Sequence, residues 1–145
     1  MNEYVIRTIQ PKDYHDIHEL NIKAGYTYDE DKVKQRIQNI LDTGSDFAMV
    51  AELGNKVVGY IHGTPYNTLY SDSLVSIVQM VFSKETREDQ NLTTEMMKEF
   101  EELVKHNGFA GIRMAADADR KVLYDIMLNS DYENKRDLRH YIKFF

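Results

Sequence analysis

The sequence predicts a mixed α/β fold, in which helices cover both faces of a mixed sheet. The strongest observation is residues 75–108, which read as a strand, a polar turn and a long amphipathic helix. The strand, VSIVQMVF, has the β-branched and large apolar residues of a buried central strand. The second observation is the order of the predicted elements: strand, helix, helix, three antiparallel strands, helix, strand, helix, strand. Helices that follow strands in this order favour a sheet covered on both faces.

The first third of the chain is predicted to form a strand and two helices. Tyr4–Ile9 is the strand, because it contains the β-formers Val5 and Ile6. Pro11 suits the first turn of the first helix, which ends at Ala24-Gly25. The second helix begins near Asp31 and ends at Gly44. Apolar residues on its inward face are Val33, Ile37, Ile40 and Leu41.

A hairpin precedes the central strand. Residues 47–52 and 56–64 are its strands, because Gly54-Asn55 is a plausible two-residue turn. A polar loop then leads to the strand at 75–82, and the charged turn SKETREDQN leads on to the long helix. Thr93–Glu95 suit the start of this helix, and Gly108 suits the position just past its end. Its apolar face consists of Met96, Met97, Phe100, Leu103 and Val104.

Three short elements are predicted to complete the chain. Residues 111–115 form a strand, in which Ile112 and Met114 alternate with Arg113. Residues 120–129 form the last helix, and Tyr141–Phe145 is the closing strand.

Composition restricts the classes of protein that this chain can belong to. Its 145 residues predict a single domain over residues 1–145. A net charge of −6 argues against a nucleic-acid partner and mildly suits a cationic amine. The absence of cysteine excludes disulfides, thiolate zinc sites and a thiol nucleophile, and fits a reducing compartment such as the cytoplasm. No signal peptide and no apolar run of membrane length are visible.

The central segment also predicts a place for an anion. A strand that delivers a loop to a helix N-terminus gathers free backbone N–H groups at the positive end of the helix dipole. This geometry is common in α/β proteins, so alone it indicates only that something anionic could bind.

Residues 75–108 resemble the cofactor-binding motif of the GCN5-related N-acetyltransferases (GNAT). In that family a strand runs into a glycine-rich pyrophosphate loop and a long helix, and the loop reads Gln or Arg, two residues, Gly, one residue, then Gly or Ala. Asn91 and Thr93 stand at the two glycine positions. The Arg or Gln position falls on Glu88, unless Arg87 fills it by a one-residue shift. The order of elements is similar to the family over nearly the whole chain, which implies a GNAT-like acyl-CoA N-acyltransferase fold with the cofactor entering between the fourth and fifth strands.

The resemblance implies acetyl transfer from acetyl-CoA to an amine. By this resemblance, the backbone of Met80, Val81 and Phe82 holds the pantetheine arm, and Arg87 is a cation near the phosphates. The backbone N–H groups of Gln90, Asn91, Leu92, Thr93 and Thr94 hold the pyrophosphate. The implied acceptor is a primary amine of a small molecule or peptide. A homodimer is allowed, and neither metal, nucleic acid nor membrane is expected.

The acid and the base are drawn from several candidates. The resemblance implies a tyrosine acid near the start of the last helix, seven residues after an Asn and shortly before a Gly-Phe pair. Asp131-Tyr132 resembles the terminal pair, and counting back from it selects Met127. Tyr124, seven residues after Asp117, is the candidate acid if three extra residues separate it from Asp131. His62 is the candidate base, because its unperturbed pKa is roughly 6.5. Glu52 and Asp72 are alternatives to His62, and Gln79, which cannot titrate, is a candidate to orient a water.

Two functions remain open on the sequence. One is an N-acetyltransferase, in which the loop tyrosines Tyr26, Tyr28, Tyr66 and Tyr70 are candidates for an aromatic wall around the amine. The other is a non-enzymatic binding or regulatory module that keeps the fold while its cofactor loop has decayed. The altered glycine positions favour the second function, and the intact order of elements favours the first.

Overall fold

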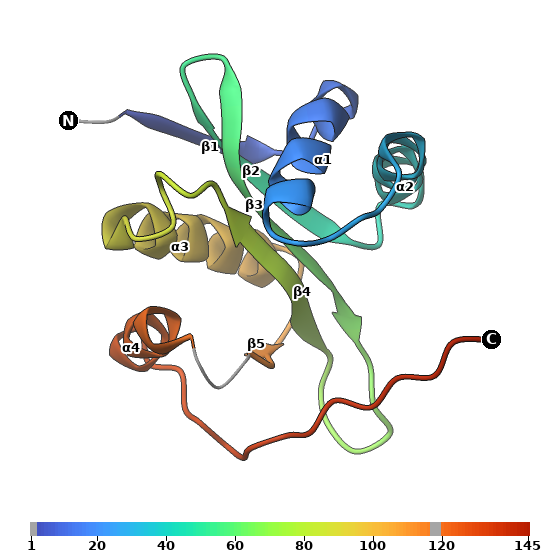
Figure 1. Cartoon of the computed structure of the whole chain (residues 1–145). Helices are drawn as coiled ribbons and strands as arrows, with labels where there is room; N and C mark the ends of the chain where they lie inside the picture. Colours follow the sequence, from blue (N-terminus) through green and yellow to red (C-terminus); the bar gives the residue numbers. More distant parts are fainter. Residues whose placement is uncertain (1–2, 117–119) are drawn as a thin grey trace. The chain divides into compact units, whose positions relative to one another are not determined.

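The computed structural model in Figure 1 describes residues 3–116 and 120–145. It contains five strands in the order β1-β2-β3-β4-β5. The first four strands pair antiparallel and β5 pairs parallel to β4. Strand bounds are β1 Tyr4–Thr8, β2 Phe47–Leu53, β3 Lys56–Tyr66, β4 Leu74–Phe82 and β5 Gly111–Met114. Helix bounds are η1 Pro11–Asp13 (a 3-10 turn), α1 Tyr14–Lys23, α2 Glu30–Thr43, α3 Gln90–His106 and α4 Lys121–Asn129.

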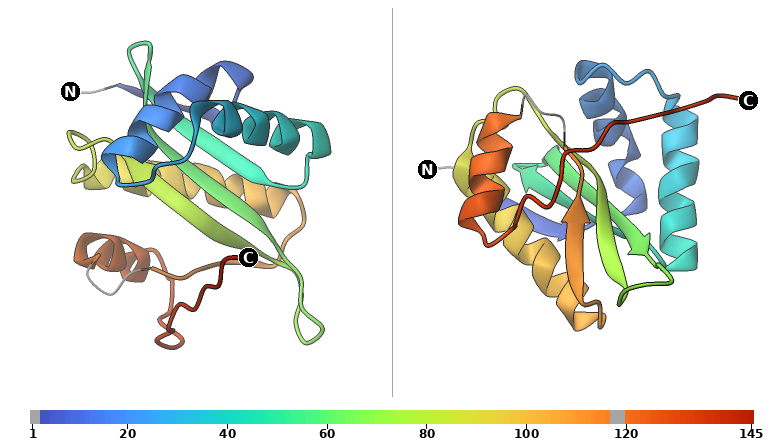
Figure 2. Two further views of the ribbon diagram at one scale, coloured as in Figure 1. Left: turned by 45° about the vertical axis from the view of Figure 1, so that its right-hand side comes forward. Right: turned by 90° about the horizontal axis from the view of Figure 1, so that it is seen from below.

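The mixed α/β class predicted from the sequence is confirmed. Helices α1 and α2 lie on one face of the sheet and α3 lies on the other (Figure 2, right). The β2–β3 hairpin also forms as expected. Gly54 has φ of +64° in its turn, a conformation that glycine adopts without strain.

The core has one part on each face of the sheet. On the α1/α2 face, apolar residues of both helices pack on the inward side chains of β2, β3 and β4, and Val50 is fully buried. On the other face, Phe100 of α3 is fully buried above Gly63 of β3. A Cβ at Gly63 would lie 2.7 Å from Phe100 Cζ, so only glycine permits this close approach.

One predicted helix start and one predicted strand are wrong. Helix α3 does not begin at residues 93–95, since its N-cap is Asp89 and its first residue is Gln90. The closing strand at Tyr141–Phe145 does not form either. Its apolar side chains are exposed, Phe145 fully and Tyr141 by 84%, and an isolated apolar segment without a strand partner gains nothing from β-propensity.

The chain divides into two compact units, one up to Met114 and one from Ala115 to Phe145. The second unit holds α4 and the extended C-terminal segment. The division does not decide the number of domains, and the single domain over residues 1–145 stays a prediction. Within the described residues, no helix is both long and apolar enough to cross a membrane.

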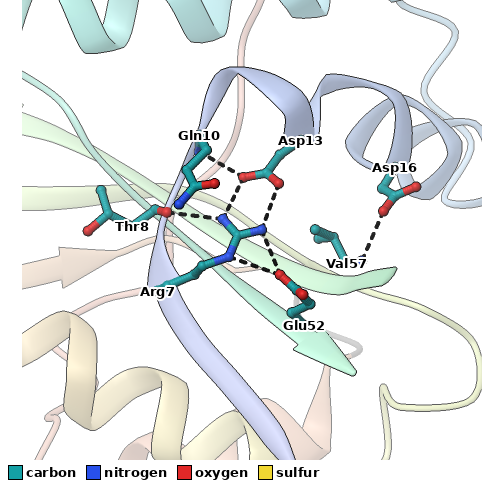
Figure 3. Close-up of polar contacts among 7 residues, drawn as sticks. All are labelled: Arg7, Thr8, Gln10, Asp13, Asp16, Glu52 and Val57. Atoms are coloured by element: carbon teal, nitrogen blue, oxygen red, sulfur yellow. Dashed lines mark hydrogen bonds and ion pairs between the residues drawn. The ribbon is translucent and has the colours of Figure 1, made fainter. Parts of the chain in front are cut away.

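A buried ion-pair network fixes β1, η1 and β2 together (Figure 3). The Arg7 guanidinium donates to both carboxylate oxygens of Asp13, at 2.9 and 2.8 Å, and to Glu52 Oε2 at 2.9 and 2.8 Å. Asp13 also accepts the Gln10 N–H at 2.8 Å. The Asp13 side chain is only 2% exposed, whereas Arg7 and Glu52 are each 19% exposed. The hydrogen bonds to Asp13, and then to Glu52, raise the pKa of Arg7 despite its burial.

Replacing Arg7 by Met should lower the free energy of unfolding by about 3–5 kcal/mol, because it leaves a buried carboxylate without its counter-ion. Urea unfolding followed by circular dichroism measures the loss. The double variant Arg7→Met with Asp13→Asn should recover part of it, because the neutral amide needs no counter-ion. A loss below about 1 kcal/mol in the single variant, the range of exposed pairs, would show that the network contributes little.

Candidate functional site

The parallel ladder between β4 and β5 covers only the first part of β4. Leu74–Ile77 pair with Gly111–Met114, and the β4–β5 pairing ends there. On its other side, β4 stays paired with β3 as far as Phe82. Among the described residues, β4 beyond Ile77 therefore has a strand on one side only. Its second edge presents backbone N–H and C=O groups that no strand pairs, which we call the β4 opening (residues 78–82).

A β-bulge marks the start of the β4 opening. Gly63 of β3 pairs with Ile77, while His62 pairs with Gln79, so Val78 is an extra residue on β4. The Val78 side chain is 55% exposed in an otherwise apolar strand. A bulge bends its strand and increases its twist. It lies directly after Ile77, where the β4–β5 ladder ends.

The predicted pantetheine residues lie in the β4 opening. Met80, Val81 and Phe82 are 3%, 6% and 8% exposed. Val81 belongs to the core on the α1/α2 face, and Phe82 packs so closely on Gly59 that a Cβ there would lie 2.5 Å from Phe82 Cδ1. Their side chains are therefore committed to the core, and only their backbone is available to a ligand.

The N-terminus of α3 is capped by a carboxylate of the chain itself. The Asp89 Oδ1 atom accepts the N–H groups of Asn91 and Leu92, at 3.1 and 3.2 Å. The Tyr4 hydroxyl donates to Asp89 Oδ2 at 2.9 Å and holds the carboxylate in place. An Asp at this position is a favourable N-cap and interacts well with the helix dipole. The position where an anion was predicted to bind is thus filled by Asp89.

The other residues of the predicted pyrophosphate loop lie on both sides of this cap. Arg87 is exposed in the turn between β4 and α3, where its N–H donates to Ser83 O at 2.9 Å. Gln90–Thr94 form the first turns of α3 rather than a loop. Leu92 and Thr93 are 1% and 4% exposed, so the bulk of Thr93 at the second glycine position points into the protein.

His62 lies one strand away from the β4 opening, opposite Gln79. Its Nε2 atom is 3.0 Å from Asp46 Oδ2, and the two side chains are 22% and 24% exposed. A carboxylate on one ring nitrogen orients an imidazole and fixes which nitrogen carries the proton. Sequence reasoning missed Asp46. The Gly54-Asn55 turn alone would pair His62 with Phe47 and leave residue 46 on the other face. The register shift at Ala51/Glu52 pairs His62 with Ala48 instead, which brings Asp46 to the face of His62, and the sequence carried no signal for this shift.

Arg113 of β5 is the second polar side chain that sequence reasoning missed. Its guanidinium carbon lies 4.4 Å from the centre of the Tyr66 ring, and its Nη1 donates to Ser76 Oγ at 3.1 Å. Ser76 is its direct partner in the β4–β5 ladder. The alternation with Ile112 and Met114 indicated that Arg113 faces the other way, but not which residues it meets.

Two of the four tyrosines expected to line the amine site have cations of the chain beside their rings. Arg113 lies 4.4 Å from the centre of the Tyr66 ring, at the end of β3, and Lys32 lies 5.8 Å from the centre of the Tyr28 ring. Tyr26 is half exposed and Tyr70 is 78% exposed. The aromatic wall stays a prediction.

The remaining candidates have separate environments. The Tyr124 hydroxyl donates to Ala116 O at 3.0 Å, a bond within the second unit. Asp117 lies outside the described residues. Glu52 pairs with Arg7, and Asp72 is exposed. Within residues 3–116 and 120–145, no three His, Asp or Glu side chains are grouped as a metal site would require.

Solved structures share this fold across nearly their whole length. The aminoglycoside N-acetyltransferase AAC(6')-Iy in complex with CoA matches with a TM-score of 0.82 at 11% identity, covering 99% of this chain and 96% of that one. The glucosamine-6-phosphate N-acetyltransferase from Arabidopsis thaliana matches at 0.80 and 15%, covering 97% and 99%. A transcriptional regulator from Bacillus halodurans matches at 0.82 and 16%, covering 97% and 100%.

The sequence matches a family model, but it matches no individual curated protein. Residues 13–135, most of the chain, match the Acetyltransferase (GNAT) family. The resemblance noted in the sequence is thereby confirmed, and the chain belongs to the GNAT acetyltransferase family.

Proposed function

We propose that the protein is an N-acetyltransferase, which moves an acetyl group from acetyl-CoA to a primary amine of a small molecule or peptide. The β4 opening carries this proposal. It places unpaired backbone groups beside a histidine–carboxylate pair on the neighbouring strand. Membership of the GNAT family supports the reaction type. A cytoplasmic location and a homodimer stay predictions.

The residues of the site fit one part of CoA better than the other. The β4 opening fits the pantetheine arm, because an extended amide chain bonds a free strand edge through the backbone alone. The N-terminus of α3 does not fit the pyrophosphate as it stands, since Asp89 fills it. A ligand phosphate would have to displace this carboxylate, or bind the exposed Arg87 beside it.

The proposed chemistry uses groups of the chain at each step. A backbone N–H of the β4 opening polarises the thioester carbonyl of acetyl-CoA. His62 takes a proton from the acceptor ammonium, and Asp46 stabilises the imidazolium that forms. The freed amine attacks the thioester carbon, so the new C–N bond replaces the C–S bond. Tyr124 gives its hydroxyl proton to the departing CoA thiolate, and the second proton lost from the attacking nitrogen restores the tyrosine hydroxyl, so one proton remains on His62 to be released to solvent.

The Asp89 cap supports a second candidate, a GNAT-fold module that regulates or binds without catalysis. A chain that has lost its cofactor is free to fill the anion position with its own carboxylate. The likeness to a protein described as a transcriptional regulator concerns the fold alone. The two candidates differ in whether acetyl-CoA binds.

Acetyl-CoA should raise the stability of the protein by about 2.7 kcal/mol at a hundredfold excess over its Kd, because it binds the native state only. Thermal melting with and without millimolar acetyl-CoA tests binding. Release of CoA thiol in the presence of amines tests transfer, and the chain has no cysteine to react with the thiol reagent. No shift in melting temperature, together with silent calorimetry, would favour the non-catalytic module.

Opening the cap should strengthen CoA binding. Asp89→Gly frees the Asn91 and Leu92 N–H groups and removes a negative charge, so Kd should fall roughly tenfold for a gain of about 1–2 kcal/mol. Asp89→Asn is the matched control, since it removes the charge while keeping a capping oxygen, and its effect should be smaller. Isothermal titration of CoA into the three proteins gives the values. Equal affinities would mean that the phosphates bind elsewhere.

The acid role of Tyr124 predicts a selective kinetic defect. Tyr124→Phe should lower kcat roughly 10²–10⁴-fold while leaving CoA affinity nearly unchanged, since the ring remains and only the proton donor is lost. Thiol release at saturating acetyl-CoA measures kcat, and calorimetry measures binding. Met127→Leu, on the same helix, conserves volume and should change little. Full activity in Tyr124→Phe would remove the tyrosine from the mechanism.

A further inference from the structure

We infer that Arg113 is an anion subsite for the acceptor, so that the amine substrate also carries a phosphate or carboxylate group. This inference rests on the proposed N-acetyltransferase function. It names the acceptor class, which membership of the family leaves undetermined.

Arg113 and His62 lie on the same face of the sheet. Val75 faces α3, because a Cβ built on Gly63 would meet both Val75 and Phe100 of that helix. Its neighbour Ser76 therefore points to the α1/α2 face, and so does its ladder partner Arg113. His62 pairs directly with Ala48, which belongs to the core on the α1/α2 face. Directly paired residues point to the same side of a sheet.

The half-buried polar residues of this face form one strip beside the β4 opening: Thr64, Tyr66, Ser76, Arg113, His62 and Gln79. Ser76 and Gln79 are three residues apart on β4, a distance of roughly 10 Å along an extended strand. An acceptor whose amine reaches Gln79 and His62 can therefore place a second group on Arg113.

The guanidinium of Arg113 is supported by two neutral groups of the described chain. Its carbon lies 4.4 Å from the centre of the Tyr66 ring, and its Nη1 donates to Ser76 Oγ. Within residues 3–116 and 120–145, no carboxylate forms an ion pair with it. The remaining N–H groups can therefore receive an anion in the two-bonded geometry that arginine favours for carboxylate and phosphate.

Arg7 shows what a structural arginine looks like in the same chain. It is also half-buried, yet its guanidinium is bonded to two carboxylates. Arg113 has a neutral hydroxyl and a ring in their place. A cation that is partly removed from water and lacks a counter-ion is stabilised when a ligand supplies one. It also repels acceptors that carry several positive charges, such as aminoglycosides.

Matched acceptors test the subsite. Glucosamine-6-phosphate is compared with glucosamine, and 6-aminohexanoate with 6-aminohexanamide, so that each pair differs in the anionic group alone. Glucose-6-phosphate, which lacks the amine, reports anion binding by itself. Titrations followed by NMR give Kd for each compound, and thiol release from acetyl-CoA gives kcat/KM for the four amines.

The wild-type protein should prefer at least one anionic member roughly tenfold to a hundredfold, the usual strength of a charge-assisted hydrogen bond. Arg113→Gln should abolish that preference with little effect on the neutral amines. Arg113→Lys keeps the charge but not the planar fork, and should retain only part of the preference. Arg36→Gln, at an exposed position of α2, is the control and should retain all of it. Melting curves verify that each variant is folded.

The outcomes separate this inference from the proposed function. Transfer to amines with no preference for the anionic members, or a preference that survives in Arg113→Gln, would overturn the subsite and leave the N-acetyltransferase standing. Arg113-dependent binding of the anionic compounds without any transfer would support the subsite and count against the enzyme. Absence of binding by all five compounds would overturn the subsite. Which pair shows the preference decides between phosphate and carboxylate.

Discussion

The unequal pairing of β4 is the constraint on which the rest of the site depends. One edge of this strand is bonded to β3 as far as Phe82, and the other edge is bonded to β5 only as far as Ile77. A backbone edge left open inside a folded protein is costly unless water or a ligand satisfies it. The bulge at Val78 lies where that open edge begins, while the neighbouring side chains of β4 remain in the core. The strand thus holds the fold together with its side chains, and the proposed site uses only its backbone.

The two parts of the expected cofactor site, at β4 and at the start of α3, differ in how far they depend on side-chain identity. Backbone binding along β4 does not depend on side-chain identity, so loss of the family's sequence pattern has no direct effect there. At the start of α3 the side chains decide the outcome. Thr93 causes no obstruction because it points inward, and the altered first glycine position, Asn91, is exposed. The change with consequences is Asp89, which lies outside the two glycine positions and supplies the anion that the helix end attracts.

The sequence was sufficient for elements with strong local signals. The hairpin formed where Gly54-Asn55 predicted it, and the second helix ended at Gly44, which caps it with φ of +63°. The start of α3 was misplaced because SKETREDQN and the residues after it offer several capping side chains, and propensity alone does not choose among them. YIKFF at the C-terminus has β-forming residues, but a strand forms only where a neighbour pairs with it.

The candidate site was less predictable than the fold, because the contacts between its side chains depend on which residues of neighbouring strands pair with each other. Asp46 reaches His62, and Arg113 reaches Ser76 and Tyr66, only once the pairing of three strands is known. The same residue type also has opposite roles in one chain. Arg7 is bonded to two carboxylates and ties β1 to its neighbours, whereas Arg113 contacts a ring and a hydroxyl, and no carboxylate among the described residues pairs with it. Both arginines contribute the same charge to the composition. The difference between them lies in the partner of each guanidinium, and the inferred anion subsite rests on that difference.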